Sequence, residues 1–424
     1  MNENSIGDVF NAKPRVAEPT WLPEPESRER KHLLISVDDH VVEAPDMFEG
    51  RMPAHLADRA PKVIETDSGE QYWEFNGKRF PNIGLNAVAG RPPGEFTAEP
   101  ERFDHMRRGC WDVEARIHDM DLNGVYASLN FPSMLAGFAG QRFSQLDDAE
   151  LGLATLRAWN DWIIEEWSDP YPGRFIPAQL AFLADPVKAA HEIRLNAQRG
   201  FKAVTFSENP AKLGLPSVHD RCWDPFWQAC EETETVICLH VGSSSSTMTT
   251  SPDAPPDVAT MLFPLSAWLA AADWVFSKVP IRFPKLKIVL SEGGISWVPA
   301  LIDRMDHSMK YATDFYGTWQ GEELKPSELF RRNFWFCAID DPSGFRQRDL
   351  IGIDHIMFEV DYPHADGTWP DSLAVVDTMV TQAGMSPAEI AKVTALNAAL
   401  LFRHPLPAEL SLGNAWPNPD LVGT

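Results

Sequence analysis

Acidic and imidazole side chains follow several of the most apolar stretches of this sequence. The run at 33–40 ends in Asp-Asp-His, so that one residue separates Asp38 from His40. On a β-strand, residues two apart point to the same face, so these two can bind one ion together while Asp39 points away. The other groups of this kind are Glu208, His240, Glu292, Asp361 and His364.

Each of these side chains also has an ordinary structural explanation. A single histidine at a strand end is more often a hydrogen-bonded structural residue than a ligand. Glu292 could cap the next helix, and Asp361 could brace a turn before Pro363. Several carboxylates in one site of low dielectric constant would repel one another unless a cation neutralised them. Their joint occurrence therefore predicts a metal site.

The elements that must position these residues alternate between two kinds. Helical periodicity is clear at 153–167, 186–200 and 297–309. Runs without alternation, typical of parallel strands covered on both faces, lie at 33–40, 124–132, 175–183, 201–206, 235–242, 287–294, 334–340 and 356–364. This order predicts an α/β fold, a (β/α)8 TIM barrel in preference to an open doubly wound sheet. In such a barrel, chemistry takes place at the C-terminal ends of the strands.

Segments outside the simple alternation suggest additions to the barrel. We expect the barrel over 31–403, with an N-terminal arm at 1–30 and a C-terminal arm at 404–424. A β-rich insertion is expected after the first strand, at about 44–115, because its sequence alternates around Asn76-Gly77, a hairpin signal. The insertion either caps the mouth of the barrel or is decorative.

Composition limits the partners. The net charge of −24 would repel a phosphate backbone, which argues against nucleic acid. The apolar segment 261–280 is expected to be a buried or subunit-facing helix and not a membrane span. The five cysteines form no CxxC pair and are expected to be reduced and mostly buried. We expect a cytoplasmic homodimer that acts on a small molecule.

The motifs DDHVVEAPDMF, GFKAVTFSENP, HVG, LSEGGISWVPALIDRMD and MFEVDYPHADGTWPDS resemble the amidohydrolase superfamily. The similarity runs from about 33 to 403 and is to its amidohydrolase-2 branch, which includes aminocarboxymuconate-semialdehyde and resorcylate decarboxylases. The resemblance implies a metal ion in a (β/α)8 barrel. It places the strand-one HxH motif on Asp38 and His40, the strand-five ligand on His240 and the strand-eight aspartate on Asp361. Two positions depart from the pattern, because Asp38 replaces the first histidine and Glu292 stands where the decarboxylases use a histidine.

These departures add negative charge and suggest two ions. Asp38, Glu292 and Asp361 carry three charges, and Glu208, at the position of the superfamily's bridging ligand, would add a fourth. We therefore predict a binuclear centre, with Asp38, His40 and Asp361 on one ion, His240 and Glu292 on the other, and Glu208 as a possible bridge. A donor set without thiolate suits iron, manganese or zinc.

The first function that this centre predicts is hydrolysis of an acyl bond in an amide, an ester or a thioester. A thioesterase is one such hydrolase. In that interpretation Asp361, Glu292 and His364 are the catalytic side chains, and Asp361 accepts and returns the proton. The alternative is a non-oxidative decarboxylase of an aromatic or enol-type acid, in which Asp361 or His364 protonates carbon. A barrel that serves only as a scaffold is the third possibility.

Three further residues are weaker candidates. Ser243 is assigned to substrate binding, although a plain loop explains it better. Trp369 is also assigned to substrate binding, with packing of the barrel mouth as the ordinary alternative. Glu359 shares a strand face with Asp361, so it either supports the metal ligands or pairs with a buried arginine.

Overall fold

The structure is a computed structural model that describes residues 18–26, 31–96, 99–311 and 313–407. Most of the N-terminal arm and all of the C-terminal arm beyond 407 lie outside these residues. The described part of the first arm runs without regular structure, and its Leu22 amide donates to the Gly90 carbonyl of the insertion at 2.9 Å.

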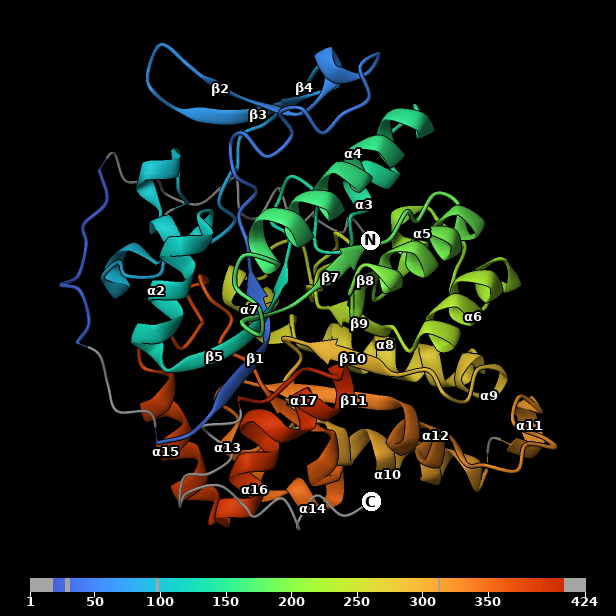
Figure 1. The fold of residues 1–424 in the computed structure, drawn as a ribbon. Helices are drawn as coiled ribbons and strands as arrows, with labels where there is room; N and C mark the ends of the chain where they lie inside the picture. The colour runs from blue at the N-terminus through green and yellow to red at the C-terminus, as the bar shows by residue number, and fades with distance from the viewer. Residues whose placement is uncertain (1–17, 27–30, 97–98, 312, 408–424) are drawn as a thin grey trace.

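Parallel strands occupy eight successive positions in the described chain (Figure 1). They are β1 (Leu34–His40), β5 (Val125–Phe131), β6 (Phe175–Ile176) continued by β7 (Ala178–Leu180), β8 (Ala203–Ser207), β9 (Val236–His240), β10 (Ile288–Ser291), β11 (Phe334–Ala338) and β12 (Ile356–Phe358). The orders β1-β5-β6 and β12-β11-β10-β9-β8-β7 are consecutive along the chain. The run predicted at 175–183 is divided because Pro177 has no amide hydrogen to donate.

Backbone hydrogen bonds join the two ends of this strand order. The His40 amide donates to the Tyr362 carbonyl at 2.6 Å, and the Asp361 amide donates to the Asp38 carbonyl at 2.8 Å. These bonds connect β1 with the segment that follows β12. The predicted α/β barrel is therefore confirmed.

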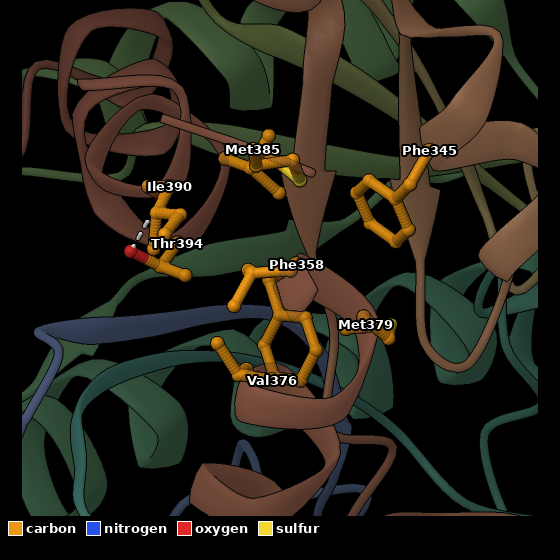
Figure 2. Close-up of a pocket in the computed structure, with 9 residues that line it drawn as sticks. Phe345, Phe358, Val376, Met379, Met385, Ile390 and Thr394 are labelled. Atoms are coloured by element: carbon orange, nitrogen blue, oxygen red, sulfur yellow. Dashed lines mark hydrogen bonds between the residues drawn. The ribbon is translucent and has the colours of Figure 1, made fainter. Parts of the chain in front are cut away.

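Helices cover the outside of the ring, as expected for right-handed βα crossovers. The main ones are α4 (Ala149–Trp162), α5 (Pro186–Gln198), α6 (Asp224–Thr233), α8 (Leu265–Phe276), α10 (Val298–Met309), α12 (Pro326–Asn333) and α15 (Ser372–Ala383). Shorter ones are α3 (Gln141–Ser144), α7 (Pro256–Leu262), α9 (Val279–Arg282), α11 (Thr313–Tyr316), α13 (Pro342–Arg346), α14 (Arg348–Ile351), α16 (Pro387–Ala391) and α17 (Asn397–Phe402). A void of about 10 Å³ beside α15 and α16 is lined by apolar side chains such as Phe358 and Met379 (Figure 2), and it is a packing gap with room for one water at most.

Two apolar clusters divide the strand residues between the interior and the outside. On β9, Ile237 and Leu239 belong to the large cluster that includes the helices, whereas Val236 and Cys238 belong to a smaller cluster. This smaller cluster collects the alternate residues of the strands and fills the barrel interior. His240 continues the inward-facing series, so its side chain enters the barrel at the C-terminal end of β9.

The predicted insertion is present and contains its own sheet. Strands β2 (Lys62–Glu65), β3 (Gln71–Phe75) and β4 (Lys78–Phe80) pair antiparallel and form a separate layer at the top of Figure 1. Helix α2 (Val113–Asn123) then leads into β5. The turn at Asn76-Gly77 has φ angles of 48° and 73°, the left-handed pair that a two-residue hairpin requires.

The apolar segment 261–280 is divided among α7, α8 and α9. One face of α8, including Ala271 and Trp274, is buried, while Leu265 and Leu269 are exposed. Within the described ranges no single helix is long and apolar enough to cross a membrane. Helices α7 and α8 reach that length and apolarity only as a pair, bent by 41°. Four of the five cysteines are buried and all are free thiols. The homodimer stays a prediction.

Candidate metal centre

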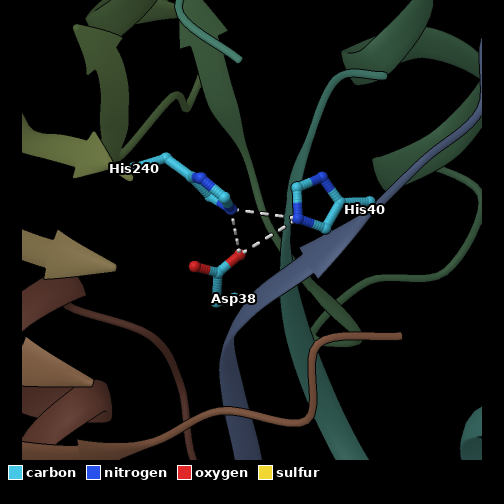
Figure 3. A group of neighbouring side chains, drawn as sticks. All are labelled: Asp38, His40 and His240. Carbon is cyan, nitrogen blue, oxygen red and sulfur yellow. Dashed lines mark hydrogen bonds and ion pairs between the residues drawn. The ribbon is translucent and has the colours of Figure 1, made fainter. Parts of the chain in front are cut away.

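Three candidate ligands meet inside the C-terminal end of the barrel (Figure 3). The Nε2 atoms of His40 and His240 are 3.1 Å apart. The Oδ1 atom of Asp38 lies 3.6 Å from His40 Nε2 and 3.5 Å from His240 Nε2. All three side chains are buried. Two imidazoles and a carboxylate thus direct their ligand atoms into one small space.

The segment after β12 adds a second carboxylate to the same space. Asp361 Oδ1 is 3.4 Å from His40 Nε2 and 2.9 Å from His364 Nδ1. Glu292, which follows β10, places Oε2 3.5 Å from His240 Nε2. With Asp366, these residues form three overlapping groups that could hold a metal ion. His40 is common to the first and second groups, and Asp361 and His364 are common to the second and third.

The two imidazoles are oriented by main-chain carbonyls. His240 Nδ1 lies 2.6 Å from the Val241 carbonyl oxygen, and His40 Nδ1 lies 3.4 Å from the Pro132 carbonyl oxygen. A ring nitrogen near a carbonyl must carry the proton, which leaves Nε2 with a free lone pair. Burial lowers the pKa of both histidines well below the usual value, which keeps both rings neutral. Neutral rings with inward lone pairs are suitable metal ligands.

The carboxylate of Asp38 has no protein partner to balance its charge. Among the described residues, neither oxygen accepts a hydrogen bond of normal geometry. Burial, followed by repulsion from Glu359 and Asp361, raises the pKa of Asp38 well above its usual value. Its neighbour Asp39 differs, because it accepts hydrogen bonds from the Ser36 hydroxyl at 2.9 Å and the Tyr362 amide at 3.1 Å. A divalent cation would supply the balance that Asp38 lacks.

Two of the acidic residues have an unusual backbone. Glu292 and Asp361 have φ angles of 56° and 57°, a left-handed conformation that side chains other than glycine seldom adopt. The Glu292 amide donates to Glu359 Oε2 at 3.1 Å. Glu359 thus hydrogen-bonds to the backbone of Glu292, a candidate ligand. This supports the prediction that Glu359 supports the metal ligands over the alternative that it pairs with a buried arginine. Burial raises the pKa of Glu359 to about 8.

His364 is a candidate proton carrier. Burial disfavours its charged form, but the adjacent Asp361 carboxylate outweighs this and raises the pKa of His364. Its ring also packs on that of His40, with centroids 4.0 Å apart. Glu292 has 16% of its side chain accessible, so it is partly open to solvent.

The structure does not bring Glu208 to the other ligands as a bridge. Its two carboxylate oxygens accept hydrogen bonds from the Ser243 and Ser244 hydroxyls. Among the described residues, the groups that could hold a metal do not include it. Ser243, predicted to bind substrate, is buried and also bonds to the His240 carbonyl at 2.6 Å, so its contacts are structural. Glu208 lines a cavity of about 320 Å³ together with Ser244 and Ser246, whereas Ser243 is not among its lining residues.

The contacts of Trp369 are packing contacts, which is the alternative to its predicted role in substrate binding. Its indole donates to the Asp119 carbonyl at 3.0 Å, and the Arg107 guanidinium lies 4.3 Å from its ring centroid. Tyr362 joins this group by donating its hydroxyl hydrogen to Asp119 Oδ2 at 2.6 Å. These contacts hold the segment after β12 against α2.

The sequence interpretation missed two side chains: Asp366, which joins Glu292, Asp361 and His364 in one candidate group, and Phe138. Its ring centroid lies 4.3 Å from that of His240 and 4.9 Å from that of His40. The only hint in the sequence is its position shortly after a predicted strand, between Gly137 and Gly140. Loops at that end of a barrel carry function, but sequence alone does not say which of their side chains points inward.

Comparisons with known proteins agree with this architecture. The sequence model of the family described as amidohydrolase matches residues 54–404. This range begins after β1, so Asp38 and His40 join the site through the structure and not through the match. The donor set of imidazoles and carboxylates can hold a divalent ion and has no thiolate within it.

Solved structures share the fold. An amidohydrolase from Mycobacterium avium subsp. paratuberculosis is 23% identical over 88% of this chain and 99% of its own, with a TM-score of 0.67. A 5-carboxyvanillate decarboxylase from Sphingomonas paucimobilis is also 23% identical over the same shares, with a TM-score of 0.62. A 5-carboxyvanillate decarboxylase from Novosphingobium aromaticivorans, complexed with manganese, is 16% identical over 91% of this chain and 100% of its own, with a TM-score of 0.61.

Proposed function

Because the chain belongs to the amidohydrolase family, we propose that it is a metal-dependent decarboxylase that releases carbon dioxide, without oxidation, from an aromatic or enol-type acid. The names of two similar solved structures, both decarboxylases and one complexed with manganese, support this choice over hydrolysis. The sequence favoured an acyl-bond hydrolase, which becomes the competing outcome of the test below.

The observation that carries the proposal is the overlap of the candidate ligand groups. His40 Nε2 lies within 3.6 Å of Asp38, His240 and Asp361 alike, and His40 is common to two of the groups. Glu208, the bridge that a second ion would use, is hydrogen-bonded to two serines. One ion held by Asp38, His40, His240 and Asp361 is therefore the arrangement we propose.

A divalent ion bound there would supply positive charge that clamps the substrate carboxylate and an adjacent hydroxyl oxygen. In the reaction, the bond between the ring carbon and the carboxylate breaks and carbon dioxide leaves. The electron pair stays on the ring carbon, and a proton takes the place of the carboxylate. No electrons are gained or lost overall.

The chain's own residues handle that proton. His364 is held at Nδ1 by Asp361 at 2.9 Å, which leaves Nε2 to face a substrate. We assign delivery of the proton to His364 Nε2. Glu292 belongs to the same candidate ligand group as His364 and is partly exposed, so it can return a proton to His364 from solvent.

The test is a substrate panel on protein loaded separately with manganese, zinc and iron. Hydroxybenzoates should release carbon dioxide, and in D2O the product should carry one deuterium at the position of the lost carboxylate. The His364→Asn variant should keep its metal and lose most of this activity. Hydrolysis of esters, thioesters or amides with no carbon dioxide from any acid would refute the proposal, as would two ions per chain required for turnover.

A further inference from the structure

Phe138 covers the candidate metal centre from the side of the barrel mouth. It lies on the loop between β5 and α3, and its ring centroid is 4.3 Å from His240, 4.9 Å from His40 and 6.5 Å from His364. With Leu85 and Met134 it forms a small apolar cluster separate from the two main ones. We call these three residues the apolar cap.

The loop that carries Phe138 is fixed to its surroundings. Gly137 and Gly140 have φ angles of 73° and 66°, which lets the chain turn sharply on both sides of the aromatic ring. The side chain of Gln141 accepts a hydrogen bond from the Ala139 amide at 2.9 Å and donates one to Ser245 Oγ at 3.2 Å. Since Ser245 belongs to the loop after β9, Phe138 is tied to the strand that carries His240.

The insertion supplies another part of the cap. Leu85 lies in a loop whose Val88 and Ala89 amides both donate to the Pro363 carbonyl at 3.0 Å. Pro363 stands between Asp361 and His364. The predicted role of the insertion as a cover for the barrel mouth is thus supported by direct hydrogen bonds to the segment that carries the site.

We infer that Phe138 determines specificity by packing against the aromatic ring of the substrate, with Leu85 and Met134 completing an apolar wall. This inference rests on the proposed function. A carboxylate and hydroxyl held at the four ligands would bring the rest of an aromatic acid beside the Phe138 ring. Aromatic rings attract one another at centroid separations of 4.5 to 7 Å in offset or edge-to-face geometry, whereas a small aliphatic acid would gain almost nothing from this wall.

Phe131 provides a matched control. Its ring also packs on His240 and His40, with centroids 4.8 and 5.9 Å away. Phe131, however, is the last residue of β5, is completely buried and belongs to the interior cluster. A change at Phe131 should disturb the imidazoles without touching the space where the substrate ring would lie.

The experiment compares two ligands on the manganese-loaded protein by isothermal titration calorimetry. Salicylate and glycolate both offer a carboxylate beside a hydroxyl, but only salicylate has a ring. Unchanged protein should bind salicylate more tightly. Phe138→Ala should weaken salicylate about tenfold, which is about 1.4 kcal/mol, and glycolate less than twofold. Phe138→Tyr should keep the preference, and Phe131→Leu should affect both ligands to a similar degree.

Several results would overturn the inference. One is equal weakening of the two ligands by Phe138→Ala at unchanged metal content. Another is unchanged protein that binds salicylate no better than glycolate. The measurement is independent of turnover. Absence of carbon dioxide release would refute the proposed function alone, whereas a lost ligand preference in an active decarboxylase would refute only the role of Phe138.

Discussion

Replacement of Asp38 by asparagine should raise the stability of the metal-free protein and reduce the further stabilisation that metal binding gives. Asp38 is fully buried, and among the described residues its oxygens have no hydrogen-bond donor of normal geometry. In the metal-free protein the amide removes an uncompensated acid, so the melting temperature should rise. In the loaded protein the same change removes an anionic ligand, so the stabilisation by metal should shrink.

The size of both effects follows from the site. Burial, with repulsion from Glu359 and Asp361, raises the pKa of Asp38 well above its usual value, and a buried polar group that lacks a hydrogen bond costs about 1 to 3 kcal/mol. For 424 residues, an unfolding entropy of about 2.1 cal/mol/K per residue makes 1 kcal/mol equal to roughly 1 °C. The metal-free variant should therefore melt roughly 1 to 3 °C higher. A 100-fold loss of affinity removes about 2.7 kcal/mol, or roughly 3 °C, from the stabilisation that metal binding gives.

Differential scanning calorimetry with excess manganese and with chelator measures both numbers. Asp39→Asn is the matched control, because Asp39 is equally buried but hydrogen-bonded to Ser36 and Tyr362. It should leave the difference between the two melting temperatures within about 1 °C of the unchanged protein, whereas Asp38→Asn should reduce that difference by roughly 3 °C. The reasoning is refuted if Asp38→Asn lowers the stability of the metal-free protein and leaves metal affinity unchanged.

The remaining predictions concern pH, the serine contacts and the hairpin. Burial raises the pKa of Glu359 to about 8, so the stability it contributes is complete below about pH 4.5 and is lost as pH rises through 8. Metal-free protein, kept in chelator, should therefore lose about 2 kcal/mol of unfolding free energy between pH 6 and 8. Differential scanning calorimetry should show no such loss for the manganese-loaded protein. Ser243→Ala should cost about 1 to 3 kcal/mol in urea denaturation, because Glu208 loses a hydrogen bond, yet it should leave manganese affinity within about threefold; a large loss of affinity would show that Glu208 is a ligand. Gly77→Ala should cost about 1 kcal/mol, because its φ angle is 73° although a Cβ there would meet no atom within 4 Å, and carbon dioxide release should not change.

Much of the fold could be predicted from the sequence. The strands are continuous apolar runs separated by segments of helical period, and this order leaves few topologies for a parallel sheet. Asn76-Gly77 predicted the hairpin because only a few residue types tolerate positive φ at both turn positions. The division at Pro177 was missed, although proline at that position removes one donor from the strand.

Less of the site could be predicted. Alternation placed Asp38 and His40 on one face, and the structure directs both toward His240. The expected bridge, Glu208, is engaged by serines that stand more than 30 positions along the chain, which sequence reading cannot pair with it. Phe138 escaped notice for the same reason, since a loop aromatic carries no periodicity that marks its direction.

The sequence by itself determined which groups are available and in what order strands present them, because side-chain chemistry and the two-residue period of a strand are local properties. The tertiary structure decided where those groups point. Val37 belongs to the interior cluster and its neighbour Asp38 also points inward, because the pairing of β1 with β5 shifts register between Ser36 and Asp39. Closure of the ring between Asp38 and Asp361 then brings residues more than 300 positions apart into contact, and that closure depends on the packing of the whole barrel.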